Sequence, residues 1–258
     1  MLRPSAPSAV VRLFGLEIQA ATLGGATALL AGRADLAPAA VVVTPNVDHL
    51  VRLDRQPDFQ RRYAGADFIF ADGMPVVWAS RLLGRPLPER VTGSDLFVEL
   101  CREAVRRDWR VTVLGGMPGS EAMLRDRFQQ AYPGIDVDLI CPSMRFDPHG
   151  PEALDAVARI QARAPQAVFV CLGMPKQELW ALQHAPALPG GIVLCVGAAM
   201  EFGLGLQRRA PRWVQRAGLE WLSRLLSDPR RFWRRYLVDD PHFLRLCWRE
   251  WRRMRTAR

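Results

Sequence analysis

The chain has 258 residues, 49% of them hydrophobic, which is enough to bury a sizeable core as one large domain or as one domain with an appendage. It contains no run of about 18 uncharged apolar residues, which argues against a spanning helix, and its first residues lack the apolar stretch of a signal peptide. The five cysteines form no C-x-x-C pair, so we expect buried thiols in a reducing cytosol rather than a disulfide framework or a zinc site.

The net charge of +9 lies almost entirely at the carboxyl end. Residues 207–258 hold fifteen arginines and only five acidic residues, together with five of the eight tryptophans, whereas residues 1–206 are close to neutral. We therefore expect two parts: a body of residues 1–206 and a basic, tryptophan-rich appendage of residues 207–258.

Short β-rich apolar runs alternate with helical patterns from about residue 10 to residue 198. The expected strands are Val10–Phe14, Ala40–Thr44, Phe68–Phe70, Arg110–Leu114, Asp136–Ile140, Ala167–Leu172 and Ile192–Val196. The helical patterns between them include Pro75–Leu83, Ser94–Arg107, Ser120–Ala131, Pro151–Arg163 and Gln177–His184. Such alternation predicts an α/β, Rossmann-like parallel sheet with helices on both faces, which binds ligands at the carboxyl ends of its strands.

The pattern changes after Gly205, where no further strand is expected. Pro211, Pro229 and Pro241 each suit the first turn of a helix. We therefore expect the appendage to consist of short helices.

Small or polar residues follow five of the expected strands, at what should be one edge of the sheet. The candidate site residues there are Thr44, Asn46, Asp72, Gly115, Gly116, Gly173, Lys176, Gln177, Glu178 and Glu201. Simpler roles are also open. Asn46 and Asp72 precede helical patterns, where they would act as N-caps. The Gly115-Gly116 turn either tightens a strand-to-helix junction or cradles a phosphate on its backbone N–H groups.

Two further patterns bear on ligands and metals. Lys176 is the only lysine of the chain, and it is either a solvated loop residue or a ligand contact, while Gln177 and Glu178 offer an amide and a carboxylate to sugar or ribose hydroxyls. Asp136-Val137-Asp138 matches the D-x-D of metal-dependent sugar transferases, but it lies within an expected strand, so we interpret the match as accidental. No metal or other cofactor is expected.

Several spaced segments resemble the motifs of a known family. They are Thr44-Pro45-Asn46, Ala71-Asp72-Gly73, Arg90–Asp95, Gly173–Glu178, Arg209-Ala210-Pro211 and Gly218–Leu222. In this order, over about residues 10–240, they look like those of the WecG/TagA/CpsF glycosyltransferases, family 26. The resemblance implies inverting transfer of a sugar from a UDP-sugar to an undecaprenyl-diphosphate-linked acceptor, without a metal.

The resemblance also implies roles for particular residues. Asp72 would be the general base that takes the proton of the acceptor hydroxyl. Thr44 and Asn46 would orient acceptor or donor sugar in the same pocket, and Arg90 and Gln177 would contact the sugar or the diphosphate.

Other positions would bind the nucleotide or close the site. Gly115, Gly116, Gly173, Lys176 and Glu178 are expected around the UDP-sugar. Where many relatives have Asp, this chain has Glu201, which would keep a ribose contact with a longer reach. The resemblance aligns three tail residues with arginines that close over the active site and grip diphosphate, namely Arg224, Arg231 and Arg234.

The interleaved Trp and Arg of the tail suit a solvated basic face, a nucleic-acid surface or an interfacial helix. The neutral body and the prenyl-linked acceptor favour an anionic membrane, where each basic residue adds about 1 kcal/mol. We therefore expect a cytoplasmic enzyme attached peripherally to the inner face of the plasma membrane. An apolar surface exposed by an undocked tail would allow a homo-oligomer.

Two other functions compete with this one. An NAD-dependent dehydrogenase needs G-x-G-x-x-G after an early strand and an acidic residue about 20 positions later, and neither is present. A basic nucleic-acid-binding protein without catalysis is the alternative, and its affinity for DNA would fall steeply with salt. The donor sugar stays open among N-acetylmannosamine, its uronic acid and glucose, and so does the polysaccharide pathway.

Overall fold

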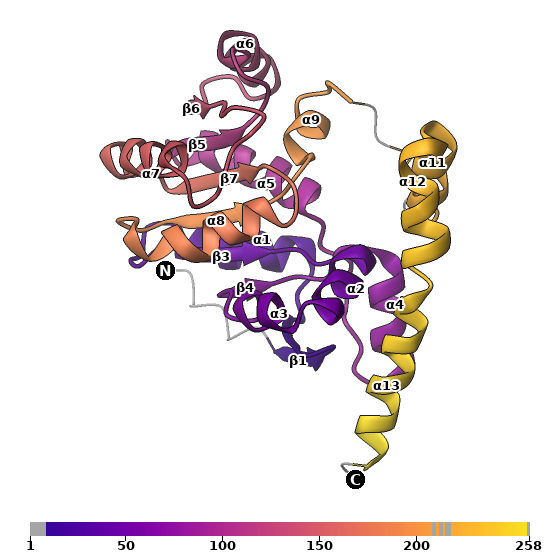
Figure 1. Cartoon of the computed structure of the whole chain (residues 1–258). Helices are drawn as coiled ribbons and strands as arrows, with labels where there is room; N and C mark the ends of the chain where they lie inside the picture. The colour runs from indigo at the N-terminus through magenta and orange to yellow at the C-terminus, as the bar shows by residue number, and fades with distance from the viewer. Residues whose placement is uncertain (1–8, 208–209, 212–213, 215–217, 257–258) are drawn as a thin grey trace.

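The computed structural model describes residues 9–207, 210–211, 214 and 218–256. Its centre is a six-stranded parallel sheet in the order β4-β3-β8-β7-β5-β6 (Figure 1). The strands are β3 (Ala40–Val43), β4 (Phe68–Ile69), β5 (Arg110–Gly115), β6 (Asp136–Ile140), β7 (Ala167–Cys171) and β8 (Ile192–Cys195). All six were expected from the sequence to within one residue at each end, so the α/β, Rossmann-like core is confirmed.

Helices cover both faces of the sheet. One face carries α1 (Leu23–Arg33), α5 (Gly93–Arg106), α6 (Glu121–Ala131) and α9 (Ala199–Gly203). The other carries α2 (Val47–Arg55), α3 (Pro57–Tyr63), α4 (Met74–Leu82), α7 (Pro151–Arg163) and α8 (Lys176–His184), followed by a 3₁₀ turn (Ala185–Ala187).

Strand β3 shows why both faces need cover. Val41 and Val43 point into one core and Ala40 and Val42 into the other, and all four are at most 5% exposed. Burying one such valine is worth about 1.5 kcal/mol or more relative to water. A strand made only of Ala and Val is therefore stable only between two helical layers.

One expected strand lies outside the sheet. Val10–Phe14 was expected to join the parallel sheet, and this was wrong: β1 (Val10–Leu13) pairs antiparallel with β2 (Leu16–Gln19) in a separate hairpin. Phe14 and Gly15 form the turn with φ of 54° and 76°, the positive pair that a two-residue hairpin turn requires. The buried residues of the hairpin pack against the core beside β4.

The described part of the tail is helical, as expected. It comprises α11 (Glu220–Ser227), α12 (Pro229–Arg234), a π-helical turn (Arg235–Asp239) and α13 (His242–Thr256). Helix starts at Pro229 and directly after Pro241 are confirmed, whereas Pro211 borders residues 212–213, which lie outside the described residues. These helices run along one side of the body, next to α4 and α2 (Figure 1).

Ion pairs attach the tail to α2. The ion pairs are Asp48–Arg235 (3.7 Å), Arg55–Asp239 (2.6 Å) and Asp54–Arg249, and His242 Nε2 lies within hydrogen-bond distance of Asp54 Oδ2 (3.0 Å). Part of the positive charge of the tail is therefore compensated by the body.

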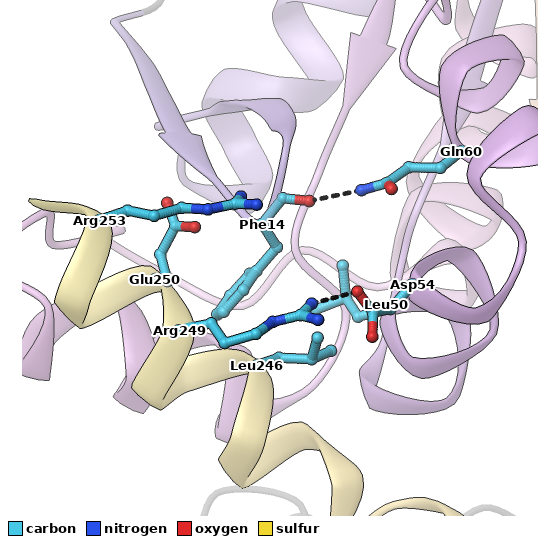
Figure 2. Close-up of a pocket in the computed structure, with 8 residues that line it drawn as sticks. All are labelled: Phe14, Leu50, Asp54, Gln60, Leu246, Arg249, Glu250 and Arg253. Carbon is cyan, nitrogen blue, oxygen red and sulfur yellow. Dashed lines mark hydrogen bonds and ion pairs between the residues drawn. The ribbon is translucent and has the colours of Figure 1, made fainter.

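Apolar contacts complete this attachment. Phe243 and Leu246 of α13 are 6% and 5% exposed and belong to the same core cluster as α2. The rings of Phe14 and Phe243 lie 5.4 Å apart between centroids. Figure 2 shows the seam, with a cavity of about 70 Å³ between α13, α2 and the hairpin. The division at residues 206 and 207 stays a prediction, and α13 adds to the core of the body across it.

Among the described residues, no helix combines the length and the apolar character needed to cross a membrane.

The packing of α13 predicts a graded effect of leucine truncation. We expect Leu246→Ala to lower the free energy of unfolding by about 2–3 kcal/mol, because it leaves a void in the seam. Leu244→Ala on the same helix, where the side chain is 72% exposed, should change it by less than about 0.5 kcal/mol. Urea denaturation of the full chain measures both, and equal effects would show that α13 does not pack as described.

Candidate active site

The segments singled out in the sequence meet at the carboxyl edge of the sheet. Because β4, β3, β8, β7 and β5 are consecutive neighbours, the residues that follow them leave the sheet side by side. Thr44 follows β3, Asp72 follows β4, Gly197 follows β8 and Gly173 follows β7. In a parallel sheet this is the edge at which ligands bind.

Close packing joins three of these segments. Thr44 is 6% exposed. A Cβ on Gly93, the first residue of α5, would lie 3.0 Å from Thr44 Oγ1 and 3.4 Å from Val196 Cα. A larger residue at Gly93 would crowd this contact, which brings the amino end of α5 against the ends of β3 and β8.

Asn46 and Asp72 differ in their relation to the helices that follow. Asn46 is the N-cap of α2, and its Oδ1 accepts a hydrogen bond from the His49 backbone N–H (3.1 Å). Asp72 is not an N-cap, because that position of α4 is taken by Gly73. The backbone N–H of Asp72 donates to Pro45 O (3.0 Å), which fixes the half-buried Asp72 beside the Thr44–Asn46 loop.

Gln177 and Glu178 lie beneath the surface of this edge. They are 3% and 1% exposed, and Gln177 Nε2 donates to Glu178 Oε1 (2.8 Å). Gln177 Oε1 accepts from the backbone N–H groups of Gly173 (3.2 Å) and Gly197 (2.9 Å). The amide of Gln177 thus ties together the loops that follow β7 and β8.

A buried tyrosine, Tyr63, lies near Glu178, and a partly exposed histidine, His49, lies beside that tyrosine. Burial raises the pKa of the Tyr63 hydroxyl well above its usual range, and the acidic groups of Glu178, Cys195 and Asp72 raise it further. His49 Nδ1 lies 3.5 Å from the Tyr63 hydroxyl oxygen, and burial lowers the pKa of His49 to about 4. His49 is therefore neutral at physiological pH.

The Gly115-Gly116 turn after β5 is tightly packed, as expected if it tightens the junction between strand and helix. A Cβ on Gly115 would lie 2.7 Å from the carbonyl oxygen of Cys171, and one on Gly116 would lie 2.9 Å from Leu124. By contrast, a Cβ on Gly173 would meet nothing within 4 Å, so the loop after β7 is open where a ligand could approach.

The remaining candidates lie at helix starts. Lys176 is partly exposed at the first position of α8, and Glu201 is exposed on the short α9. For both residues, contact with the nucleotide stays a prediction.

The D-x-D match has a structural explanation. Asp136 and Asp138 lie within β6 and form ion pairs with Arg163 and with Arg159 (3.1 Å), respectively. Within the described residues, no three His, Cys, Asp or Glu side chains gather as a metal-binding group. Independence from metal ions stays a prediction.

Arg90 connects the site to the tail. Its guanidinium lies 2.5 Å from Glu220 Oε2, at the start of α11, and 3.8 Å from Asp95 Oδ2. The side chains of Arg90 and Glu220 are only 13% and 21% exposed. A Cβ on Gly218 would lie 2.5 Å from Trp78 and 3.0 Å from Met74 Cβ, so the tail crosses the start of α4, two residues from Asp72.

The three arginines expected to grip diphosphate lie on the tail. Arg224 is in α11 and Arg231 in α12, but their side chains lie outside what the structure describes. Arg234 ends α12 with an exposed side chain.

Some residues of the site were not singled out from the sequence. Tyr63 comes from a helix 9 residues before Asp72 and carries no motif. Gly93 and Glu220 lie inside quoted segments, and only their contacts show that one sets the approach of α5 and the other pairs with Arg90.

Fold and site define an α/β protein of Rossmann-like architecture whose polar segments converge at one sheet edge. The family model described as glycosyl transferase WecG/TagA/CpsF matches residues 11–257, and the chain belongs to this family. It is 32% identical over 198 residues to the N-acetylglucosaminyldiphosphoundecaprenol N-acetyl-beta-D-mannosaminyltransferase of Bacillus spizizenii, covering 77% of this chain and 75% of that protein. The chain is thus a glycosyltransferase, as its motifs predicted, and the non-catalytic alternative is set aside.

The Arg90–Glu220 pair predicts measurable coupling between body and tail. In a double-mutant cycle with Arg90→Gln and Glu220→Gln, we expect a coupling energy of about 1 kcal/mol or more in the free energy of unfolding, because both groups are largely shielded from water. The control cycle uses Arg12→Gln and Glu17→Gln, a pair whose side chains are 78% and 56% exposed, and should give below about 0.5 kcal/mol. Equal coupling in the two cycles would contradict the tail contact.

Proposed function

We propose that the chain transfers a sugar, with inversion, from a UDP-sugar to a polyprenyl-diphosphate-linked sugar. Asp72 carries this proposal, since it follows β4 at the carboxyl edge of the sheet, and its backbone N–H donates to Pro45 O beside the Thr44–Asn46 loop. The named activity of the Bacillus relative, which joins an N-acetylmannosaminyl group to a lipid-linked N-acetylglucosaminyl diphosphate, supports the same substrate class.

The reaction needs a general base beside the acceptor hydroxyl and positive charge or N–H donors beside the leaving diphosphate. The Asp72 carboxylate takes the proton of the acceptor hydroxyl as that oxygen bonds to the anomeric carbon. The bond from the anomeric carbon to the phosphate oxygen breaks, and UDP leaves with the electron pair. General-base help of this kind contributes about 10²–10⁴-fold.

The other site residues support this step. Thr44 and Asn46 orient acceptor or donor sugar, with Asn46 using its amide N–H groups because its Oδ1 caps α2. Arg90 contacts the sugar or the diphosphate, and Gln177 shapes the site through Gly173 and Gly197.

The leaving diphosphate needs positive charge. Arg224, Arg231 and Arg234 supply it as the tail closes over the edge, and Lys176 and the backbone amides near Gly173 add to it. The reaction in this proposal uses no metal ion.

N-Acetylmannosamine is the first donor to test, because the Bacillus relative is named for it. N-Acetylmannosaminuronic acid and glucose are the other candidates. The product would enter a cell-surface polysaccharide.

The donor proposal is tested by transfer to a synthetic polyprenyl-diphosphate-linked N-acetylglucosamine. The three candidate UDP-sugars are supplied with and without EDTA. We expect one donor to react equally well in EDTA, and Asp72→Asn to lower kcat by about 10²–10⁴-fold while UDP binding persists. The control, Asp58→Asn on α3, removes a carboxylate that is 92% exposed and should leave kcat unchanged. Full activity of Asp72→Asn would exclude Asp72 as the base.

We further propose that the enzyme works at the cytoplasmic face of an anionic membrane, attached by its tail. Exposed apolar side chains line the tail helices: Trp221, Leu226, Trp233, Leu237, Val238, Leu244, Trp248 and Trp251. On α13, Arg252 lies over the ring of Trp248 (4.5 Å) and Arg255 over that of Trp251 (4.0 Å). Aromatic rings beside arginines suit the boundary between acyl chains and anionic headgroups. Self-association through the same apolar surface would occur only away from the membrane.

Vesicle binding tests this attachment. Leu244→Ala combined with Trp248→Ala should weaken partitioning into phosphatidylglycerol-containing vesicles by about tenfold or more, because each removed side chain buries apolar area in the bilayer. The matched control, Met123→Ala with Leu154→Ala, removes exposed apolar groups from α6 and α7 and should bind as wild type. Sedimentation with the vesicles at two salt concentrations measures both, and equal loss in the two variants would contradict a tail-specific contact.

A further inference from the structure

The orientation of the Gln177 side-chain amide determines whether the loops after β7 and β8 are tied together. Its Oε1 accepts from Gly173 N–H and Gly197 N–H, which begin the loops after two neighbouring strands. If the amide were reversed, an NH₂ group would face two donors and both bonds would be lost. A hydrogen-bond acceptor on the opposite side of the amide, facing its NH₂ group, stabilises the observed orientation further.

Glu178 supplies that acceptor. Its Oε1 receives the Gln177 Nε2–H at 2.8 Å, and its side chain is 1% exposed. Its second oxygen, Oε2, is buried and has no hydrogen-bond partner. An ionised carboxylate with one bare oxygen in such a place is costly, whereas the neutral acid is far less so.

The groups facing Glu178 come from several elements. Arg52 on α2 favours its ionised form through its charge, but burial outweighs this and raises the pKa of Glu178 to about 7. Tyr63 on α3 and Cys195 on β8 are also close enough to interact electrostatically, and both stay neutral because burial raises their pKa values. Asp72 also raises the pKa of Tyr63 through its charge, so Glu178 and the proposed base influence the same buried hydroxyl.

We propose that Glu178 is a positioning residue of the donor site that works in its protonated form. As a neutral acid it orients the Gln177 amide, and through it the loops of Gly173 and Gly197, without adding negative charge beneath the edge that receives a diphosphate. When Glu178 loses its proton, a buried negative charge opposes the nucleotide diphosphate. This inference rests on the proposed UDP-sugar function.

Binding of UDP across pH tests the proposal. Calorimetry from pH 5.5 to 8.5 gives the dissociation constants of wild type and Glu178→Gln, which keeps a neutral acceptor for Gln177. The ratio of the two constants removes the titration of UDP itself. We expect the wild-type dissociation constant divided by that of Glu178→Gln to be near one at pH 5.5. It should rise about tenfold by pH 8.5 as the wild type binds UDP more weakly, which corresponds to a shift of one unit in the pKa of Glu178 when UDP binds.

Two further variants separate positioning from charge. Glu178→Ala takes away the acceptor without adding a charge, so it should bind UDP about tenfold more weakly than Glu178→Gln at every pH, with no recovery in acid. Glu17→Gln removes the same formal charge from the exposed hairpin and should match the wild type throughout.

A readout without ligand checks the protonation state. The folded chain holds the Glu178 proton to about pH 7, whereas the unfolded chain loses it near the ordinary value of 4.5. The stability of wild type relative to Glu178→Gln should therefore fall as pH rises from about 4.5 to 7 and be constant above it.

The outcomes are distinguishable. This inference alone would be overturned if the wild type binds UDP but the ratio of its dissociation constant to that of Glu178→Gln does not change with pH. It would also be overturned if Glu178→Ala binds UDP at pH 5.5 as tightly as the wild type does. Absence of UDP binding by the wild type at every pH would overturn the proposed function as well.

Discussion

The parallel pairing of β3 with β8 is the constraint on which the site depends. Ala40 pairs with Ile192 and Val43 with Cys195, so strands from opposite ends of the body finish side by side. The loops after them then begin as neighbours, and α5 starts in the narrow space between. A slip of one residue would turn every side chain of β3 to the other face. Because both faces are packed, the fit of these side chains against the two helical layers holds this register, and with it the geometry of the edge.

The arginines of the basic tail fall into two groups that net charge cannot separate. Arg235 and Arg249 pair with acidic residues of α2, so they hold the tail against the body. Arg252 and Arg255 instead lie over exposed tryptophans, on a surface suited to an anionic bilayer. A positively charged segment of this kind can thus be both part of the fold and a membrane contact. The Arg90–Glu220 ion pair then connects the start of the tail to the edge of the sheet that Asp72 follows.

The sequence predicted the sheet well because its strands are short apolar runs, and such a run is the pattern typical of a strand that is buried on both faces. It misplaced Val10–Phe14, since an apolar run looks the same in a parallel sheet and in a hairpin, and only the positive φ of Phe14 and Gly15 separates the two. It also left Asn46 and Asp72 with the same capping alternative. In the structure Asn46 is the N-cap of α2, whereas Asp72 caps no helix because Gly73 occupies the N-cap position of α4.

By itself, the sequence determined the α/β class, the order of the strands along the chain, the family, and the gathering of polar segments at one edge, because each depends on local composition and spacing. Only the tertiary structure decided that Gln177 and Glu178 are buried partners, that Gly93 touches Thr44, and that Glu220 reaches Arg90. These contacts join residues from separate elements, or depend on which side of a helix faces the core. Such distances and exposures follow from packing the whole chain, and no short pattern encodes them.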